Sequence, residues 1–120
     1  MLNLDTHILL HALAGTVRPR EQRLLRDRWS ISAIVLCEIA KLAQLGRIGV
    51  DLHHEGLCRV LERIEVFPIS IEVCRAMSHL DFRSNPADEL IAATSLVHGV
   101  PLLTRDRRIL RSRVVPLARR

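Results

Sequence analysis

Hydrophobic residues occur along the chain in short runs that alternate with stretches of helical spacing. The runs typical of strands cover residues 2–4, 29–32, 65–69, 101–104 and 114–117. Helices are expected between them, near residues 6–13, 18–28, 33–45, 51–63, 70–80 and 86–98. Gly15, Gly46 and Gly99 are helix stops, and Asn85 before Pro86 is a typical helix start. This alternation predicts an α/β fold with a mainly parallel central sheet of four to five strands between two helical layers.

The length of the chain suits one domain. It has 120 residues, of which 48% are hydrophobic, and a chain of this size can form a core without disulfides or metals. No apolar run approaches the roughly 18 residues that a membrane-spanning helix needs. The first residues also lack the basic start of a secretory signal. We therefore expect a single domain over residues 1–120, located in the cytoplasm and without membrane attachment.

The basic charge is carried almost entirely by arginine. The formal net charge is +5, and Lys41 is the one lysine among 18 basic residues. Because arginine binds phosphate through paired hydrogen bonds, this composition indicates a nucleic-acid partner, although an arginine-rich solvated surface explains it equally well. The three aromatic residues are Trp29, Phe67 and Phe82. With so few rings for base stacking, we expect RNA to be contacted through its phosphates and shape.

The cysteines give information about the compartment but not about the chemistry. Cys37, Cys58 and Cys74 are odd in number, widely spaced and set in apolar helical patterns. A disulfide framework uses an even number of cysteines, and a zinc site uses pairs at close spacing. We therefore expect all three to be small, reduced residues buried in the core.

Four acidic residues occupy positions that surface solvation does not explain. Asp5 ends the first expected strand, and Glu38 lies in a helix among apolar neighbours. Asp88 lies in the first turn of a later helix, and Asp106 follows the fourth expected strand. Because function in parallel α/β sheets gathers beyond the carboxyl ends of the strands, we expect these four carboxylates to meet at one edge.

A cluster of carboxylates predicts a bound cation. Two like charges about 4 Å apart repel by about 4 kcal/mol at an effective dielectric constant of about 20. Oxygen ligands favour Mg²⁺ or Mn²⁺ over zinc, and such a site in a basic protein is typical of phosphodiester hydrolysis. Taken singly, each acid also has a structural explanation, at a helix N-terminus or beside an arginine.

Other polar residues are expected to be structural. Glu21 is one of several acids interleaved with arginines, which predicts a solvated helix face. His7 and His11 are four residues apart on one helical face, but the glutamate of a zinc-protease motif is missing between them. We therefore expect structural or peripheral roles for both histidines.

Four segments of the chain carry a resemblance to a known family. They read LDTHILL at residues 4–10, SAIVLCEIAK at 32–41, PADELIAAT at 86–94 and GVPLLTRD at 99–106. In this order and spacing they resemble the acidic motifs of PIN-domain ribonucleases, and in particular of the VapC-like toxins of type II toxin–antitoxin modules. The resemblance covers nearly the whole chain, so it implies a single PIN-like nuclease domain over residues 1–120 with a three-layer α/β/α fold.

The resemblance implies roles for individual residues. The catalytic, metal-binding carboxylates are Asp5, Glu38, Asp88 and Asp106, and the supporting hydroxyls are Thr104 and Thr6. Separately from the resemblance, the arginine-rich segment that begins beside Asp106 makes Arg105, Arg107 and Arg108 candidate RNA phosphate contacts, with a solvated chain end as the alternative. The sequence departs from the family at Asn85, where relatives often carry aspartate, at Cys37, where many carry tryptophan, and at Glu89, where many carry arginine. Asp88 is preferred over Glu89 because the family pattern places the acid three residues before the Ile-Ala pair.

The expected function is that of a Mg²⁺- or Mn²⁺-dependent endoribonuclease toxin. By resemblance, metal-activated water cleaves RNA to 5′-phosphate and 3′-hydroxyl ends, and a cognate antitoxin holds the enzyme inactive. A homodimer is also expected, because 48% hydrophobic residues in a chain of this size leave an apolar surface patch. The alternative is a catalytically silent PIN-fold module that binds nucleic acid or protein. A phosphoacceptor receiver domain is not favoured, because Asn3 and Thr6 flank Asp5 where paired acids are needed. A haloacid-dehalogenase-type phosphatase needs a second aspartate where the chain has His7.

Overall fold

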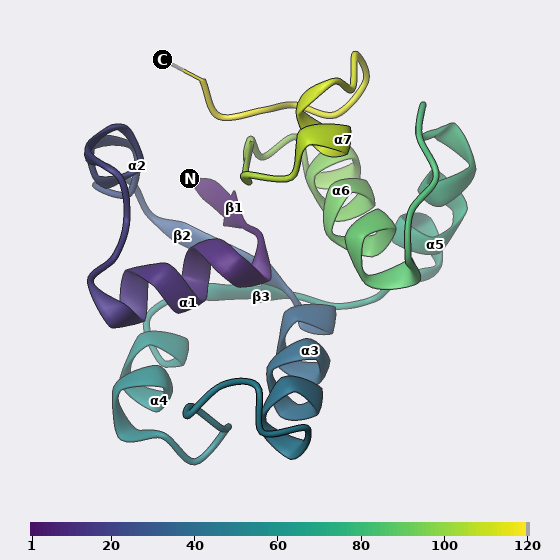
Figure 1. The fold of residues 1–120 in the computed structure, drawn as a ribbon. Helices are drawn as coiled ribbons and strands as arrows, with labels where there is room; N and C mark the ends of the chain where they lie inside the picture. The colour runs from purple at the N-terminus through teal and green to yellow at the C-terminus, as the bar shows by residue number, and fades with distance from the viewer. Residues whose placement is uncertain (120) are drawn as a thin grey trace.

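The computed structural model describes residues 1–119 and is built on one four-stranded sheet (Figure 1). The strands are β1 (Leu2–Leu4), β2 (Trp29–Ser32), β3 (Glu65–Phe67) and β4 (Leu102–Leu103). They lie in the order β3-β2-β1-β4, and every pairing is parallel. The predicted α/β class with a parallel sheet is confirmed.

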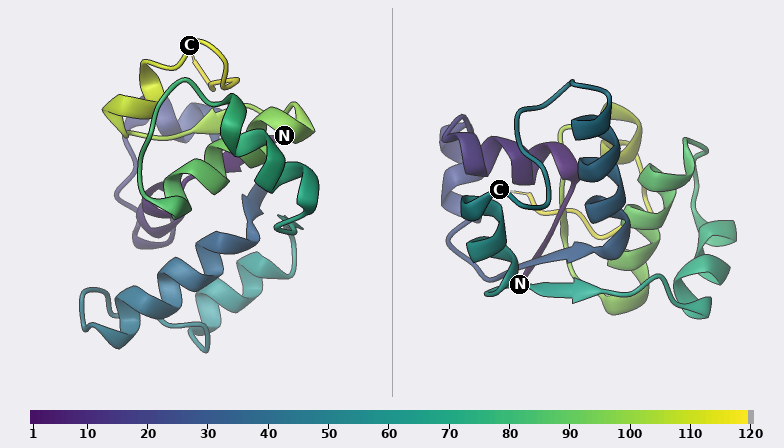
Figure 2. Two further views of the ribbon diagram at one scale, coloured as in Figure 1. Left: turned by 90° about the vertical axis from the view of Figure 1, so that its right-hand side faces the viewer. Right: turned by 90° about the horizontal axis from the view of Figure 1, so that it is seen from below.

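Helices cover both faces of this sheet. They are α1 (Thr6–Ala14), α2 (Pro19–Leu24), α3 (Ala33–Gln44), α4 (Glu55–Leu61), α5 (Ile71–Ala76), a 3₁₀ turn η1 (Met77–His79), α6 (Pro86–His98) and α7 (Arg107–Leu110). The chain steps from β1 to β2 to β3, and then crosses back to β4 at the opposite edge. Because such crossovers are right-handed, α5 and α6 lie on the face opposite α1, α2 and α4 (Figures 1 and 2).

This winding places a crevice at the carboxyl ends of β1 and β4. The connection that leaves β1 runs toward β2, whereas β4 is reached from the far side of the sheet. Neighbouring strands whose connections leave in opposite directions form a topological switch point, where ligands bind in open α/β sheets. Asp5 follows β1, and Thr104 follows β4, so both lie at this point.

Local signals in the sequence correctly predicted several helix ends. Gly15 and Gly99 end α1 and α6 in the left-handed region, at φ of 72° and 64°, where a β-carbon would be strained. Asn85 caps α6, because its side chain accepts a hydrogen bond from the Asp88 amide at 2.9 Å. Ser70 caps α5 in the same way through the Val73 amide at 3.1 Å.

The expected last strand is reduced to a single bridge. Within residues 114–117, only Leu117 pairs, in parallel with Leu102. The amides of Val114 and Val115 instead donate to the Ser112 hydroxyl oxygen, at 3.2 and 3.1 Å. Pro116 has no amide hydrogen to give to a ladder. The segment therefore begins as a turn and meets the edge of β4 only at its end.

Two expected helices are shorter than their apolar patterns. The pattern over residues 51–63 yields only α4, because Asp51 makes a turn by accepting from the His53 amide, and His54 caps the helix by accepting from the Leu57 amide. The pattern over residues 18–28 yields only α2. Within residues 1–119, no helix combines the length and hydropathy needed to cross a membrane.

The prediction of buried cysteines was wrong. Cys37 and Cys74 are exposed, Cys58 is half-buried, and all three thiols are free. On α3 the fully buried residues are Val35 and Ile39, at positions that turn Cys37 toward solvent. An apolar sequence pattern can therefore overstate burial, because it does not show which face of a helix the rest of the chain covers.

Candidate active site

Asp5 lies at the centre of the crevice between β1 and β4. It is 5% exposed and begins α1, where its Oδ1 accepts a hydrogen bond from the Thr6 amide at 2.7 Å. Its Oδ2 accepts from the Thr104 hydroxyl at 2.6 Å. Thr104 in turn accepts from the Asp106 amide at 3.0 Å. Thr104 therefore connects the carboxylate of one predicted ligand to the backbone of another.

Glu38 reaches the same point from α3. Its Oε1 accepts from the Thr6 hydroxyl at 2.5 Å, and its side chain is half-buried. Thr6 thus donates its backbone amide to Asp5 and its side chain to Glu38. Both predicted supporting threonines are bonded to predicted carboxylate ligands, which fixes the orientation of these acids.

Asp88 is contributed by the first turn of α6. Its Oδ2 accepts from the Ser84 hydroxyl at 2.8 Å and from the Asn85 side-chain amide at 3.0 Å. Glu89 points elsewhere, since it accepts a hydrogen bond from the Ser84 backbone amide at 2.8 Å and does not line the crevice. The structure therefore places Asp88, and not Glu89, toward the other acids.

A buried asparagine holds α6 against the sheet. The side chain of Asn3, in the middle of β1, donates to the Ile91 carbonyl at 3.2 Å and to the Ser95 hydroxyl at 2.9 Å. Both acceptors lie on α6, so this contact sets the position of that helix along β1. The first turn of α6, with Asp88, consequently lies near the carboxyl end of β1.

All four predicted carboxylates line one cavity of about 390 Å³. Its lining residues are Asp5, His7, His11, Glu38, Asn85, Asp88, Arg105 and Asp106. They come from α1, α3, α6 and the segment after β4. The topology thus brings residues from distant parts of the chain to one place.

Burial and mutual repulsion act on the protonation of two of these acids. Burial raises the pKa of Asp5 above its ordinary value, against the hydrogen bonds from Thr104 and Thr6, and the charge of Asp88 raises it further. Burial likewise raises the pKa of Glu38, and the charges of Asp5 and Asp88 add to this effect. The three carboxylates therefore interact, and a cation among them would favour their charged forms.

Asp106 has a structural role that is visible in its contacts. It caps α7, because its Oδ1 accepts from the amides of Arg108 at 2.9 Å and Ile109 at 3.1 Å. A carboxylate at this position is also favoured by the helix dipole. Since Asp106 also lines the cavity, the structural explanation and the predicted ligand role apply to the same residue.

The donor set suits a hard divalent cation. Within residues 1–119, no three histidine, cysteine, aspartate or glutamate side chains are already arranged to hold one metal ion between them. Mg²⁺, however, is usually held by one or two carboxylates and keeps several waters. The oxygen donors of Asp5, Glu38 and Asp88 around a 390 Å³ cavity meet that requirement, with Asp106 at its edge.

Sequence reasoning missed part of this site. His7 and His11, expected to be structural or peripheral, both line the cavity. The sequence signal for this was that they lie four residues apart, and so on one face of α1, the helix that directly follows Asp5. Ser84 and Asn85 bond Asp88, and their signal was a position directly before the start of α6.

Glu21 was predicted to be solvated, and this prediction was wrong. Glu21 is 5% exposed and pairs with Arg105, at 2.7 Å to Nε and 2.6 Å to Nη2. The arginine lowers the pKa of Glu21 from 4.5 to about 2. No local pattern could have shown this contact, because the two residues are separated by most of the chain.

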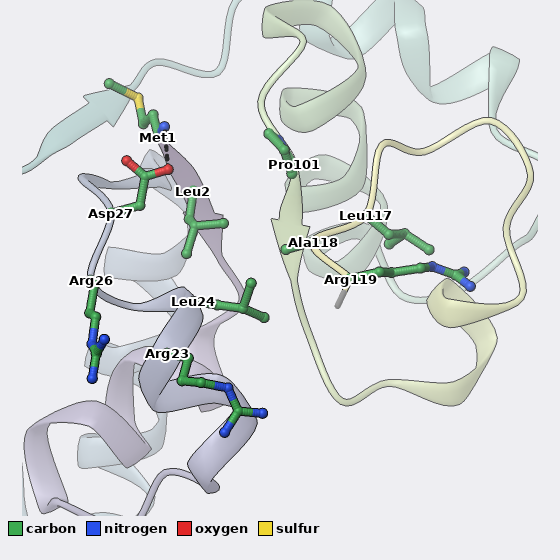
Figure 3. Close-up of a pocket in the computed structure, with 10 residues that line it drawn as sticks. All are labelled: Met1, Leu2, Arg23, Leu24, Arg26, Asp27, Pro101, Leu117, Ala118 and Arg119. Atoms are coloured by element: carbon green, nitrogen blue, oxygen red, sulfur yellow. Dashed lines mark hydrogen bonds and ion pairs between the residues drawn. The ribbon is translucent and has the colours of Figure 1, made fainter.

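A second, larger cavity lies at the amino end of the sheet and has a different character (Figure 3). Its volume is about 580 Å³, and its floor is formed mainly by apolar residues such as Leu2, Leu24 and Leu117. Asp27 is the one carboxylate among its described lining residues, and it is paired with the Met1 ammonium at 2.8 Å. The grouped carboxylates therefore point to the smaller cavity as the reactive one.

Comparison with known proteins agrees with this geometry. The family model described as PIN domain matches residues 3–114. The chain belongs to the PIN-domain family. A curated relative, Ribonuclease VapC22 of Mycobacterium tuberculosis, is 34% identical over 86 residues, which cover 69% of this chain and 66% of that protein. The match thus spans slightly less than two thirds of the relative's own length.

Solved structures show the same fold. A chain of VapBC2 from Rickettsia felis, a complex bound to a DNA fragment from its promoter, superposes with a TM-score of 0.75 at 20% identity, over 98% of each chain. A chain of DNA-bound VapBC from Salmonella typhimurium gives 0.73 at 18% identity, over 98% of this chain and 96% of that one. FitAcB from Neisseria gonorrhoeae gives 0.70 at 20% identity, over 99% and 97%. The predicted PIN-like fold is confirmed.

Proposed function

We propose that this PIN-domain protein is a divalent-metal-dependent endoribonuclease and the toxin of a toxin–antitoxin module. The observation that carries the proposal is the meeting of Asp5, Glu38, Asp88 and Asp106 around one cavity at the carboxyl edge of the sheet. The similarity to a protein named Ribonuclease VapC22 supports RNA as the substrate. All four acids of the family pattern are present, which argues against a catalytically silent module.

The residues of the cavity suit hydrolysis of a phosphodiester. When bound, Mg²⁺ or Mn²⁺ supplies an activated water and neutralises charge on the phosphate. Asp5, Glu38 and Asp88 offer oxygen ligands, and Thr104 and Thr6 hold two of these carboxylates in place by hydrogen bonds of 2.6 and 2.5 Å. By resemblance to the family, attack would be in line with the leaving 3′-oxygen and would yield 5′-phosphate and 3′-hydroxyl ends.

The proposed partners follow from the same similarity. Solved neighbours include VapBC complexes and a toxin–antitoxin complex from Klebsiella pneumoniae. We therefore propose that this chain has a cognate antitoxin. We also propose that this chain acts in the cytoplasm. A homodimer stays a prediction, for which Leu45, Ile69 and Ile71 provide exposed apolar side chains.

The proposal is tested by metal removal. Purified protein should cleave single-stranded or structured RNA in Mg²⁺ or Mn²⁺, lose activity in EDTA, and regain it when the metal is restored. The Asp5→Asn variant, purified in the same way, controls for contaminating nuclease. Cleavage of equal rate in EDTA, with the variant silent, would refute a metal-dependent mechanism.

A further inference from the structure

Arg105 is held rigidly at the wall of the carboxylate cavity. Its Nε and Nη2 donate to the two oxygens of Glu21 at 2.7 and 2.6 Å, and its Nη1 donates to Nε2 of His11 at 3.0 Å. His11 is held in turn by a contact of 2.7 Å between its Nδ1 and the Thr16 hydroxyl. The guanidinium is therefore fixed from two sides by residues of α1 and α2.

The carboxylate of Glu21 has two partners. Besides Arg105, it accepts a hydrogen bond from the amide of Arg18, the residue that caps α2, at 2.8 Å. This second contact orients the carboxylate. Burying a carboxylate is unfavourable unless it is paired and hydrogen-bonded. A buried Glu21 side chain, 7% exposed, thus presents its charge to Arg105 rather than to solvent.

Arg105 retains donors for a ligand in the cavity. An arginine has five N–H donors, of which Glu21 and His11 use three, so one remains on each of Nη1 and Nη2. Its side chain is 23% exposed and lines the cavity. Among the described lining residues, Arg105 is the one arginine or lysine beside four carboxylates.

The two neighbouring arginines are held differently. Arg107 is exposed, and Arg108 donates its Nη1 to the Arg83 carbonyl at 2.7 Å. Neither lines the cavity. The three arginines that follow Thr104 are therefore not equivalent, because Arg105 alone among them is held by side chains at the cavity wall.

We propose that Glu21 and His11 are positioning residues that hold the Arg105 guanidinium as a fixed phosphate clamp for the RNA strand entering the carboxylate cavity. This inference rests on the proposed function, because it names how that site recognises its substrate. A strand carrying phosphates is repelled by four acids, and a fixed cation beside them gives one phosphate a defined place. Fixing the guanidinium in advance also lowers the entropy lost when the strand binds.

The test measures RNA binding separately from cleavage. Binding of a short fluorescent RNA is followed by anisotropy in EDTA over a range of salt concentrations, for the wild type, Arg105→Gln, Glu21→Gln and the double variant. Arg105→Gln should weaken binding roughly ten- to a hundred-fold. It should also make the negative slope of log K against log salt shallower by about 0.7, as expected for one lost phosphate contact. Glu21→Gln should weaken binding in the same direction, and should add no further loss in the Arg105→Gln background.

Matched controls separate positioning from general stability. Arg59 and Glu55 form an exposed pair at 3.9 Å, so Arg59→Gln and Glu55→Gln make the same chemical changes away from the cavity and should leave binding unchanged. Arg105→Lys keeps the positive charge but loses the paired N–H donors of the guanidinium. It should therefore keep most of the salt slope while raising KM for RNA. It also serves as the conservative variant if Arg105→Gln folds poorly.

The outcomes distinguish this inference from the proposed function. If the wild type cleaves RNA but Arg105→Gln keeps both its salt slope and its affinity, the pair only ties α2 to the segment after β4, and the inference is overturned. An additive loss in the double variant would show that Glu21 does not act through Arg105. A wild type that binds RNA with the expected slope changes but never cleaves it would refute the proposed function and support the clamp.

Discussion

At the scale of single residues, the site is defined by carboxylates whose charges are unfavourable without a cation. Asp5 is almost fully buried, and burial raises its pKa and that of Glu38. Their hydrogen bonds from Thr104 and Thr6 offset part of this cost. The arrangement places charge where folding alone does not favour it, which is typical of a functional site.

Replacing one carboxylate by its amide should remove activity without unfolding the protein. In Asp5→Asn, the amide oxygen can still cap α1, since Asn and Asp are comparable caps, and a buried charge is lost. We expect RNA cleavage to fall by about 100-fold or more, while the free energy of unfolding in EDTA stays the same or rises slightly. Cleavage assays and urea denaturation measure the two effects. Loss of activity only in step with unfolding would show that Asp5 is structural.

Metal affinity should fall as the pH falls, because protons compete with the cation for the carboxylates. The pKa values of Asp5 and Glu38 are raised, so protons compete with the cation at a higher pH than for a solvated aspartate, whose ordinary pKa is 3.8. Mn²⁺ titration by calorimetry at several pH values tests this. Glu38→Gln should flatten the dependence, whereas the exposed-site control Glu55→Gln should not alter it.

At the scale of elements, side chains from one segment position the next. Asn3 of β1 fixes α6 through Ile91 and Ser95. The Glu21–Arg105 pair joins α2 to the segment after β4. Asp106 begins α7. The contacts of Asn3 and Asp106 position α6 and α7 relative to the carboxyl edge of the sheet, and the contact of Glu21 holds Arg105 at the cavity.

The two roles of Asp106 can be separated by two substitutions. Asp106→Asn keeps a capping oxygen and loses the charge, whereas Asp106→Ala loses both. We expect Ala to lower the free energy of unfolding by about 1 kcal/mol, and Asn to leave it nearly unchanged. Both should abolish cleavage if the charge is needed for the metal. An active Asp106→Asn enzyme would leave Asp106 with the capping role alone.

The Glu21–Arg105 pair should make the free energy of unfolding depend on pH in the acidic range. The pKa of Glu21 is lowered from 4.5 to about 2 in the folded protein, so its contribution is present above pH 4.5 and is lost as the pH falls toward 2. The contribution is at most about 3 kcal/mol. Thermal denaturation between pH 7 and 2 should show a smaller acid-induced decrease for Glu21→Gln than for the wild type. Equal slopes for the two proteins would contradict this account.

At the scale of the whole molecule, the sheet order creates the site. The order β3-β2-β1-β4 places the first and last strands side by side, so Asp5 and Thr104 bond at 2.6 Å although they lie near opposite ends of the chain. The nearby acids of α3 and α6 complete the cavity. A cavity of this charge is a target for a partner that offers a cation.

An antitoxin that places an arginine among these acids should compete with the metal. Arginine forms charge-assisted hydrogen bonds with carboxylates, and the same oxygens are the proposed metal ligands. We expect the C-terminal tail of the proposed antitoxin to carry this arginine. Calorimetry of that tail, with and without about 10 mM Mg²⁺ at matched ionic strength, should show weaker binding when Mg²⁺ is present. An affinity independent of Mg²⁺ would show that inhibition works by blocking RNA access and not by occupying the acids.

The sequence by itself determined most of the helices and strands and singled out the four candidate acids. The strands at residues 2–4 and 29–32 were predicted with the bounds that the structure has, because each is a short run that ends where a helical pattern begins. Asn85 and Gly99 marked the ends of α6 for equally local reasons. Asp5 and Glu38 stood out because each lay in an apolar context without a neighbouring arginine.

Only the tertiary structure decided which side chains meet and which faces are covered. Glu21 looks solvated in the sequence, yet it is buried against Arg105, because the two contacting segments are far apart along the chain. Cys37 looks buried, yet it is exposed, because within residues 1–119 no segment covers its face of α3. The spacing of apolar residues indicates the local secondary structure. Burial and side-chain pairing depend instead on distant segments that the sheet order brings together.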